Sequence, residues 1–348
     1  MKAHTKVKHI VLENYLKAWF PIMAFSNERI IYIDGFAGPG KYTSGEDGSP
    51  IMALKIATDI YIKFTKKLIN KEFIFIFIEQ DKRTFESLSA EIDTLHLPKE
   101  FKIFKIRNHF AEAMEEVIST VKKRLDPTFA FIDPFGTKGV PFELVNKIMS
   151  YKKCEVFLNF MNSGVVRSAG VTDHTDLFGT DEWTEYIDLP PQLKNDAFLE
   201  LYKKQLKKVA NVSFTRSFNV KNKKNSTIFD LIYATNNEFG LDKMKIAMWK
   251  ADPLGNFTFC DKTDPNQTVL FEMEPDLTPL AKDLLTNFSG QKISINKIEK
   301  HVIINTPYLS THIKMKTLHK LEKEGIISVK RSDGSTKGYT EGTIITFP

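Results

Sequence analysis

Residues 29–41 read RIIYIDGFAGPGK, an apolar run that ends in an acid and is followed by three glycines. A continuous apolar, β-branched run is typical of a strand buried in a parallel sheet. Glycines directly after such a strand let the backbone turn sharply and approach a ligand closely. Ligands of open α/β sheets bind at the carboxyl ends of the strands, so the stretch predicts a ligand-binding loop after Asp34.

The same strand-and-helix unit recurs through the first 160 residues. Further strands are predicted at 73–78, 101–106, 129–132 and 155–160, with helices at about 49–68, 83–95, 111–125 and after Pro141. This alternation predicts a doubly wound α/β fold with a parallel sheet and right-handed crossovers. A helical lead-in occupies residues 1–28, with an apolar stripe that ends near Pro21, and Ser49 is predicted to cap the helix that Pro50 begins.

The pattern changes after residue 190. A basic helix is predicted at about 193–210, then an antiparallel hairpin at the sheet edge (212–220 and 227–235), and a further helix at 239–250. Residues 253–274 are rich in Pro, Asp and Asn and indicate a linker or a small hairpin. Three helices follow (277–288, 293–302 and 306–324), and then a hairpin (326–330 and 342–347), which together predict a winged helix-turn-helix. We therefore predict two domains, 1–274 and 275–348.

The formal net charge of +6 is distributed unevenly along the 348 residues. Residues 201–225 contain eight Lys and Arg and no acid, and residues 276–348 contain 11 Lys and Arg against 7 Asp and Glu. A mildly acidic body with two basic regions is typical of a nucleic-acid binder, although solvated helix and hairpin faces give the same pattern. The predicted phosphate contacts are Lys203, Lys204, Lys207, Lys208, Lys221, Lys223, Lys224, Lys316 and Lys320. In the last predicted helix, Met315, Leu318 and Leu321 are expected on the face opposite Lys316 and Lys320.

Only two cysteines are present, Cys154 and Cys260, and their spacing matches no metal site. We expect reduced thiols, no metal and a cytoplasmic protein, because no signal peptide or apolar span of about 20 residues is found.

The glycine loop has two interpretations. Residues 35–41 satisfy the phosphate-loop pattern G-x-x-x-x-G-K, and Asp133 at the end of a strand could serve the magnesium side of such a site. However, Tyr42 stands where a phosphate loop needs Ser or Thr, and the next helix is predicted to begin only at Ser49. These two departures disfavour a phosphate-loop nucleotidase, which stays an alternative interpretation.

The second interpretation is a loop that binds S-adenosylmethionine (SAM). Asp34 could accept a hydrogen bond from the cofactor's ammonium group, and Glu79, after the second strand, could bind the ribose hydroxyls. Asn108, after the third strand, could contact the adenine. The loop residues assigned to the cofactor are Gly35, Phe36, Gly38 and Gly40. The dinucleotide pattern G-x-G-x-x-G is absent, which disfavours NAD.

A second motif, Asp133-Pro134-Phe135-Gly136, follows the fourth strand. The Asp133 carboxylate and the Pro134 carbonyl could accept hydrogens from an exocyclic amine and so aim its lone pair at a methyl group. Phe135 could stack on the base, which must be flipped out if it lies in a duplex. The alternative is a tight turn in which Asp133 only caps the next segment.

The loop 34–40 and the motif 133–136 resemble motifs I and IV of class I SAM-dependent methyltransferases. Nearly the whole chain resembles the three-Cys-motif partner family, through residues 4–9, 15–20, 32–40, 48–50, 239–245 and 247–250. The resemblance implies a Rossmann-like, seven-stranded methyltransferase sheet with a C-terminal winged helix, and a partner protein with a three-cysteine, radical-SAM-like motif. Asp-Pro-Phe-Gly is also similar to the motif of tRNA guanine-N2 methyltransferases, but Phe135 replaces the second Pro common in amine methyltransferases.

The sequence thus predicts a SAM-dependent methyltransferase that acts on nucleic acid, with RNA favoured over DNA and an exocyclic base amine as target. Asp133, Pro134 and Phe135 are the predicted catalytic residues. A catalytically silent partner protein that docks a radical-SAM-like enzyme on nucleic acid is the other alternative.

Overall fold

The computed structural model describes residues 2–121, 125–260, 274–332 and 338–348, which divide into two compact units. Unit 1 holds the residues up to Asn237 together with the strand Thr258–Cys260, and unit 2 holds Glu238–Phe257 and the described residues from 274 onward. The domain boundary after residue 274 stays a prediction. Within the described ranges, every helix is too short or too polar to cross a membrane.

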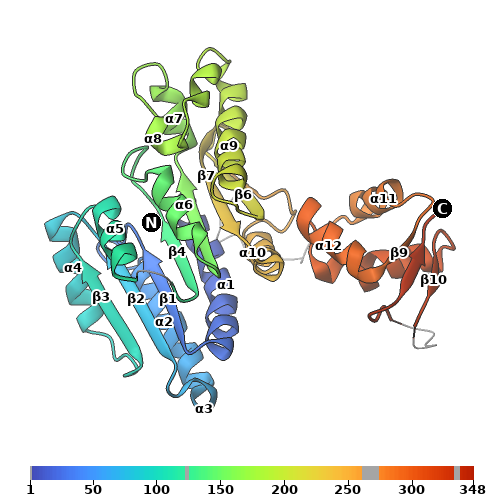
Figure 1. The fold of residues 1–348 in the computed structure, drawn as a ribbon, viewed down its shortest axis with the longest axis horizontal. Helices are drawn as coiled ribbons and strands as arrows, with labels where there is room; N and C mark the ends of the chain where they lie inside the picture. The colour runs from blue at the N-terminus through green and yellow to red at the C-terminus, as the bar shows by residue number, and fades with distance from the viewer. Residues whose placement is uncertain (1, 122–124, 261–273, 333–337) are drawn as a thin grey trace. The chain divides into compact units, whose positions relative to one another are not determined.

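Unit 1 is built on an eight-stranded sheet with the order β3-β2-β1-β4-β5-β7-β6-β8 (Figure 1). Strands β1 to β5 run parallel, whereas β7 is antiparallel to both β5 and β6. The predicted doubly wound α/β fold is confirmed, and the short strand β8 adds an edge beyond the predicted hairpin. The strands are β1 Arg29–Asp34, β2 Glu72–Ile78, β3 Phe101–Ile106, β4 Thr128–Ile132, β5 Cys154–Phe160, β6 Phe214–Lys221, β7 Thr227–Thr235 and β8 Thr258–Cys260.

The helices of unit 1 fall close to their predicted positions, with two corrections. The first helix ends at Ser26, within the predicted helical lead-in, but its apolar face continues past Pro21 to the buried Ala24. The second helix is capped by Gly48, and Ser49 is already its first residue. The helices are α1 Ala3–Ser26, α2 Ser49–Lys63, α3 Thr65–Leu68, α4 Lys82–Asp93, α5 Phe110–Val121, α6 Phe142–Ser150, α7 Asn162–Ser168, α8 Thr175–Phe178, the 3-10 helix η1 Glu182–Tyr186 and α9 Pro191–Lys208.

The two faces of the sheet have different side chains, because alternate residues of a strand point to opposite faces. Strand β2 reads EFIFIFI, and its isoleucines join a core with residues of α5, α6 and α9. On the other face the aromatic rings gather under α1: the rings of Phe20 and Phe75 lie 6.0 Å apart, and those of Trp19 and Phe129 lie 5.8 Å apart. Both faces are therefore covered by helices, as a parallel sheet requires.

A buried polar cluster fixes α1 on the sheet. The hydroxyl of Tyr15 donates to Glu155 Oε2 at 2.6 Å and lies 2.6 Å from the hydroxyl of Tyr233, while Thr235 donates to Glu155 Oε1 at 3.1 Å. Burial raises the pKa of Glu155. Lys8 lies about two helical turns before Tyr15, so the cluster also sets where Lys8 meets the sheet.

Unit 2 contains α10 Glu238–Ala251, α11 Thr278–Asn287 and α12 Ile295–Asn305, with a three-stranded sheet of order β10-β11-β9. Its strands are β9 Lys292–Ser294, β10 Ser328–Lys330 and β11 Ile344–Thr346, and β10 and β11 form the predicted antiparallel hairpin. The tip of that hairpin and most of the predicted linker lie outside the described residues.

The predicted helix at 306–324 is wrong, because this segment is broken into three pieces. They are a 3-10 turn η2 (Ser310–His312), a π-helical turn η3 (Lys314–Leu318) and α13 (His319–Lys323). The Leu318 N–H donates to the Ile313 carbonyl at 2.8 Å, five residues back, which widens the turn. Met315 is consequently 63% exposed, contrary to its predicted place beside the buried Leu318.

Helix α10 is tied into unit 2 by three buried polar side chains. Lys245 donates to the carbonyls of Val302 and Ile303, at 3.1 and 3.0 Å, near the end of α12. Asp242 accepts two hydrogen bonds from Ser310, and the Trp249 indole donates to a backbone carbonyl at 2.9 Å. The segments 239–245 and 247–250, which carry part of the family resemblance, therefore have structural contacts within unit 2.

Candidate functional site

The strand order reverses direction at β1, because β2 lies on one side of it and β4 on the other. Such a switch point leaves a crevice at the carboxyl ends of the two strands, where open α/β sheets bind ligands. Asp34 ends β1, Glu79 follows β2, Asn108 comes shortly after β3 and Asp133 follows β4. The structure thus brings these four predicted site residues to one edge of the sheet.

Asp34 is fully buried at this edge. Its carboxylate accepts hydrogen bonds from the backbone N–H of Phe36 at 3.3 Å and from the side chain of Ser49. Burial raises the pKa of Asp34 to about 7, an effect that these hydrogen bonds oppose. Ser49 therefore belongs to the site as a hydrogen-bond donor, rather than to the helix terminus as a cap.

The glycine loop is held by Glu79. The N–H of Gly38 donates to Glu79 Oε2 at 3.1 Å, and the N–H of Asp81 donates to Oε1 at 2.8 Å. Each carboxylate oxygen has a second lone pair that could take a ligand hydroxyl. Gly38 has a φ of +66°, and a Cβ added there would meet no described atom within 4 Å, so the backbone is open to a ligand.

The other predicted cofactor residues shape the same loop. A Cβ on Gly35 would lie 2.6 Å from the Phe110 ring, so only glycine fits there. The Phe36 ring stacks on Phe110 with centroids 5.3 Å apart, and Gly40 has a φ of +83°. The amide oxygen of Asn108 accepts the N–H of His109 at 2.8 Å, just before α5.

The phosphate-loop alternative gains no support from this geometry. Lys41 forms an ion pair with Glu91 at 2.6 Å, and α2 begins only at Ser49. A phosphate loop needs its lysine directly before a helix that points its N–H groups at the phosphates.

Asp133 holds a primary ammonium group from its own chain. Lys8 Nζ lies 2.7 Å from Oδ1 and 2.5 Å from Oδ2 of Asp133, and the amide of Asn159 donates to Oδ1 at 2.6 Å. Lys8 is 7% exposed and Asn159 is 3% exposed. Both residues were missed from sequence, although a lysine on the buried face of α1 and an amide in the apolar run of β5 were visible signals.

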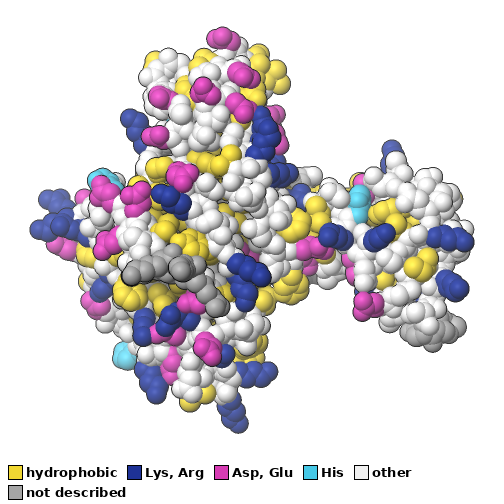
Figure 2. Space-filling model, in the orientation of Figure 1, with side chains coloured by type: hydrophobic (Ala, Val, Ile, Leu, Met, Phe, Trp, Pro, Cys, Tyr) yellow, Lys and Arg dark blue, Asp and Glu magenta, His cyan; other side chains and the backbone are white. Residues whose placement is uncertain are grey.

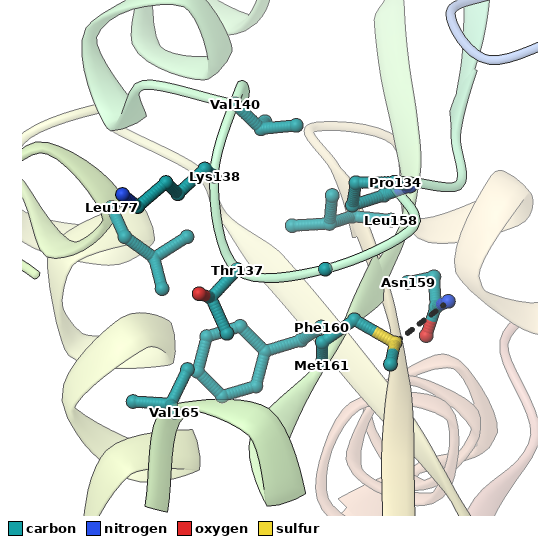
Figure 3. A pocket seen from close by; sticks show the side chains of 11 residues that line it. Pro134, Thr137, Lys138, Val140, Leu158, Asn159, Phe160, Met161, Val165 and Leu177 are labelled. Atoms are coloured by element: carbon teal, nitrogen blue, oxygen red, sulfur yellow. Dashed lines mark hydrogen bonds between the residues drawn. The ribbon is translucent and has the colours of Figure 1, made fainter. Parts of the chain in front are cut away.

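An open pocket of about 490 Å³ extends over Asp133. Aromatic side chains line it, among them Tyr42, Phe229 and Phe135, and basic groups come from Lys2, His4 and Lys8. The Phe135 ring is 88% exposed, whereas Pro134 is buried where the ends of β4 and β5 meet (Figure 3). The pocket therefore combines flat apolar surfaces with a partly buried carboxylate–ammonium pair.

The predicted phosphate contacts of unit 1 are only partly available. Lys203 pairs with Glu200 at 2.6 Å, and Lys204 pairs with Glu182. Lys207, Lys208, Lys223 and Lys224 are exposed, and Lys221 is half-buried. On the face shown in Figure 2, Lys and Arg side chains of unit 1 are interspersed with Asp and Glu rather than gathered in one stripe.

The two predicted lysines of unit 2 also have acidic neighbours. Lys316 and Lys320 line a pocket of about 550 Å³ together with Glu274, Asp276 and Glu324. This face of unit 2 is therefore mixed in charge and not uniformly basic.

Comparison with known families shows a match at residues 258–334 to the family described as GMT-like wHTH domain. This match agrees with the predicted winged helix in unit 2. No curated protein shows significant similarity to the chain.

Several solved structures are similar at low identity. A protein from Legionella pneumophila is 13% identical, with a TM-score of 0.42 over 68% of this chain and 85% of that one. A protein described as a caffeoyl-CoA O-methyltransferase from Staphylococcus aureus is 14% identical, with a TM-score of 0.35 over 65% and 83%. The plantazolicin methyltransferase BamL is 14% identical, with a TM-score of 0.32 over 62% and 68%. Likeness at this level carries no argument about function.

Proposed function

We propose that this protein is a SAM-dependent methyltransferase that acts on an exocyclic amine of a base in nucleic acid, with RNA favoured. The observation that carries the proposal is the pairing of Asp133 with the Lys8 ammonium at 2.7 and 2.5 Å, beside the glycine loop at the switch point. An acceptor that binds one nitrogen donor so closely is suited to bind a target amine in the same way.

The cofactor would be held by residues at the ends of β1 and β2. The buried carboxylate of Asp34 fits an ammonium group, and Glu79 has lone pairs for two ribose hydroxyls. The backbone of Gly35 to Gly40 fits a ligand that lies directly against it, because Gly38 leaves the space above the loop open. Asn108, shortly after β3, would contact the adenine.

The chemistry requires little more than positioning. When bound, the cofactor would supply a methyl group on a positively charged sulfur. Asp133 would accept a hydrogen bond from the amine and take up the proton that the amine loses. Asp133 and the Pro134 carbonyl would orient the amine, and the exposed Phe135 would stack on the base.

Exposed basic residues support nucleic acid as the substrate. Lys207, Lys208, Lys223 and Lys224 lie on the surface of unit 1, where phosphates could reach them. RNA is favoured because Asp-Pro-Phe-Gly at 133–136 is similar to the motif of tRNA guanine-N2 methyltransferases. We also propose membership of the three-Cys-motif partner family, a radical-SAM-like partner protein and a cytoplasmic location.

One observation favours a second candidate function. Lys8 and Asn159 take three of the four lone pairs of Asp133, and so crowded an acceptor also suits a silent SAM-fold protein that docks another enzyme on nucleic acid. The acidic and basic groups around Lys316 and Lys320 are equally compatible with a protein partner.

Two measurements separate these functions. Thermal melting of the full chain with SAM, S-adenosylhomocysteine or Mg·ATP identifies the cofactor, and stabilisation by Mg·ATP alone would exclude the proposal. Transfer of labelled methyl from SAM to total tRNA, rRNA and DNA then tests for catalysis. Stabilisation by SAM without transfer to any of these would support the silent function instead.

A further inference from the structure

Asn159 lies beside Asp133 and has an acceptor that no predicted role accounts for. Its side-chain nitrogen donates to Asp133 Oδ1 at 2.6 Å and contacts the sulfur of Met161 at 3.4 Å (Figure 3). Because an ionised carboxylate only accepts hydrogen bonds, the atom that faces Asp133 must be the amide nitrogen. The amide oxygen Oδ1 is therefore identified by chemistry as the other atom.

That oxygen is an unusual group for a protein interior. Asn159 Oδ1 is buried and receives no hydrogen bond from the described residues. A buried amide oxygen without a donor costs free energy, so such groups are uncommon unless a ligand uses them. Asn159 lines the same pocket as Asp133, Tyr42 and Phe229, so the buried acceptor belongs to a residue of the predicted amine site.

The acceptor capacity of this cluster can be counted. Asp133 Oδ1 already accepts from Lys8 and from Asn159, and Oδ2 accepts from Lys8 only. With two lone pairs per oxygen, one remains on Asp133 Oδ2 and two remain on Asn159 Oδ1. An –NH2 group carries two hydrogens, so it can be bound by Asp133 and Asn159 together while Lys8 stays in place, with Asn159 rather than the Pro134 carbonyl taking the second hydrogen.

The charges of Lys8 and Asp133 determine whether a neutral or a cationic amine binds at this site. The Lys8 ammonium neutralises Asp133, so the pair offers no net attraction to a second cation, and Lys8 repels one directly. Lysine side chains and polyamines are cationic at neutral pH and have no lone pair in that form. The amines of guanine, adenine and cytosine are neutral, planar and carry two hydrogens.

We propose that Asn159 is a second acceptor for the target amine and that Lys8 makes the site selective for the neutral amine of a nucleobase over cationic amines. This inference rests on the proposed function and names two residues that lie outside the loop 34–40 and the motif 133–136. Asn159 acts by positioning the amine, and Lys8 acts through the charge of Asp133.

The test compares RNA oligonucleotides that differ by one exocyclic amine. Each is a short uridine run with a single guanosine or inosine, adenosine or purine riboside, or cytidine or 4-deoxyuridine, and binding to the full chain is measured by fluorescence anisotropy. Wild type should bind one amine-bearing member at least about fivefold more tightly than its amine-free partner, as expected for one or two hydrogen bonds. In Asn159→Leu, or in Asn159→Ala if the leucine variant melts early, this ratio should fall by at least about twofold, the loss of one hydrogen bond, and stay above one because Asp133 still accepts from the amine.

Asn195→Leu is the matched control. Asn195 also has a buried amide oxygen without a donor among the described residues, but it lies on α9, and it does not line this pocket. Its variant should keep the wild-type ratio. If Asn159→Leu kept that ratio too, Asn159 would not be an acceptor and the inference would be overturned while the proposed function remained. Equal binding of every pair by wild type would overturn both.

A second arm tests Lys8. Butylammonium should not compete with the preferred oligonucleotide in wild type, whereas in Lys8→Met it should compete, because Asp133 then lacks its cation. Equal lack of competition in the two proteins would remove Lys8 from the selectivity.

Discussion

Lys8 and Lys245 are both buried lysines on long helices, but their ammonium groups have different partners. Lys245 is 0% exposed and donates to two backbone carbonyls near the end of α12. Lys8 is 7% exposed and pairs with a carboxylate that lines an open pocket. The partners of Lys245 are backbone carbonyls, which a side-chain substitution does not remove. The partner of Lys8 is a carboxylate beside a pocket, which can accept another donor.

The different partners indicate a structural role for Lys245 and a functional role for Lys8. Carbonyls at the end of a helix lack intrahelical partners, and a cation there satisfies them and opposes the helix dipole. The contacts of Lys245 therefore need no ligand to explain them. The contacts of Lys8 leave a buried amide oxygen and part of a carboxylate without donors, which a stability role alone does not account for.

The largest expected effect comes from Asp133. Asp133→Ala should lower the rate of methyl transfer to RNA by at least about a hundredfold, because it removes the group that orients the amine and takes its proton. The measurement is single-turnover transfer of labelled methyl at saturating RNA.

This change also leaves Lys8 buried without its carboxylate, so a loss of stability could imitate a loss of chemistry. The double variant Asp133→Ala, Lys8→Met removes the unpaired charge and should recover the melting temperature but not the transfer rate. Full transfer by either protein would take Asp133 out of its assigned role.

A substitution of Lys245 should lower stability and leave SAM binding unchanged. Lys245→Met leaves the carbonyls of Val302 and Ile303 without this donor and should lower the free energy of unfolding of unit 2 by about 2 kcal/mol. Denaturant unfolding of the full chain measures this change, and SAM affinity should not alter. Lys250→Met, at an exposed position on the same helix, should unfold like wild type. An unchanged unfolding curve for Lys245→Met would show that the two carbonyl contacts do not stabilise unit 2.

Most of the sheet could be predicted because its signals are local. The apolar runs of β1 to β5 mark buried strands by themselves, and parallel pairing then brings Asp34, Glu79 and Asp133 to one edge. Helix α10 was also predicted, within one residue at each end. These features need no knowledge of which residues meet in space.

The parts that could not be predicted depend on contacts between distant residues. Lys8 and Asp133 are 125 residues apart in sequence, and nothing near either residue indicates the other. The hydrogen bond from Ser49 to Asp34 likewise depends on how α2 returns to β1. The π-helical turn at Lys314–Leu318 was missed because helical periodicity assumes 3.6 residues per turn throughout.

Asp34 gives a smaller effect that depends on pH. Its pKa is raised to about 7, and a bound ammonium group would favour the ionised form. Below pH 7 a proton must leave before SAM binds, so SAM affinity should rise about tenfold between pH 5.5 and 7. Calorimetric titration at several pH values measures this, and Asp34→Asn should bind more weakly and without the rise. A rise of the same size in Asp34→Asn would assign the dependence to another group.

The raised pKa of Asp34 makes folding stability depend on pH in the opposite direction to SAM affinity. The folded chain keeps the Asp34 proton up to about pH 7, whereas the unfolded chain loses it near 3.8, the ordinary pKa of an aspartate. The contribution of Asp34 to the free energy of unfolding should therefore fall as the pH rises from about 4 to about 7.

The smallest expected effect is on the salt dependence of RNA binding by the surface lysines. Some of these lysines form ion pairs with glutamates, and others are exposed. Lys207 and Lys223 are exposed, whereas Lys203 and Lys204 already pair with Glu200 and Glu182. Replacing Lys207 and Lys223 by Gln should reduce the slope of log affinity for single-stranded RNA against log salt by about 1.4, the value for two lost phosphate contacts.

The matched pair Lys203→Gln, Lys204→Gln should change that slope by less than half as much, because each lysine must first leave a carboxylate before it meets a phosphate. Anisotropy titrations between about 50 and 200 mM salt measure both slopes. Equal changes for the two pairs would mean that these ion pairs open at no cost when RNA binds. No change for either pair would place the phosphate contacts elsewhere and leave the amine pocket as the main contact with nucleic acid.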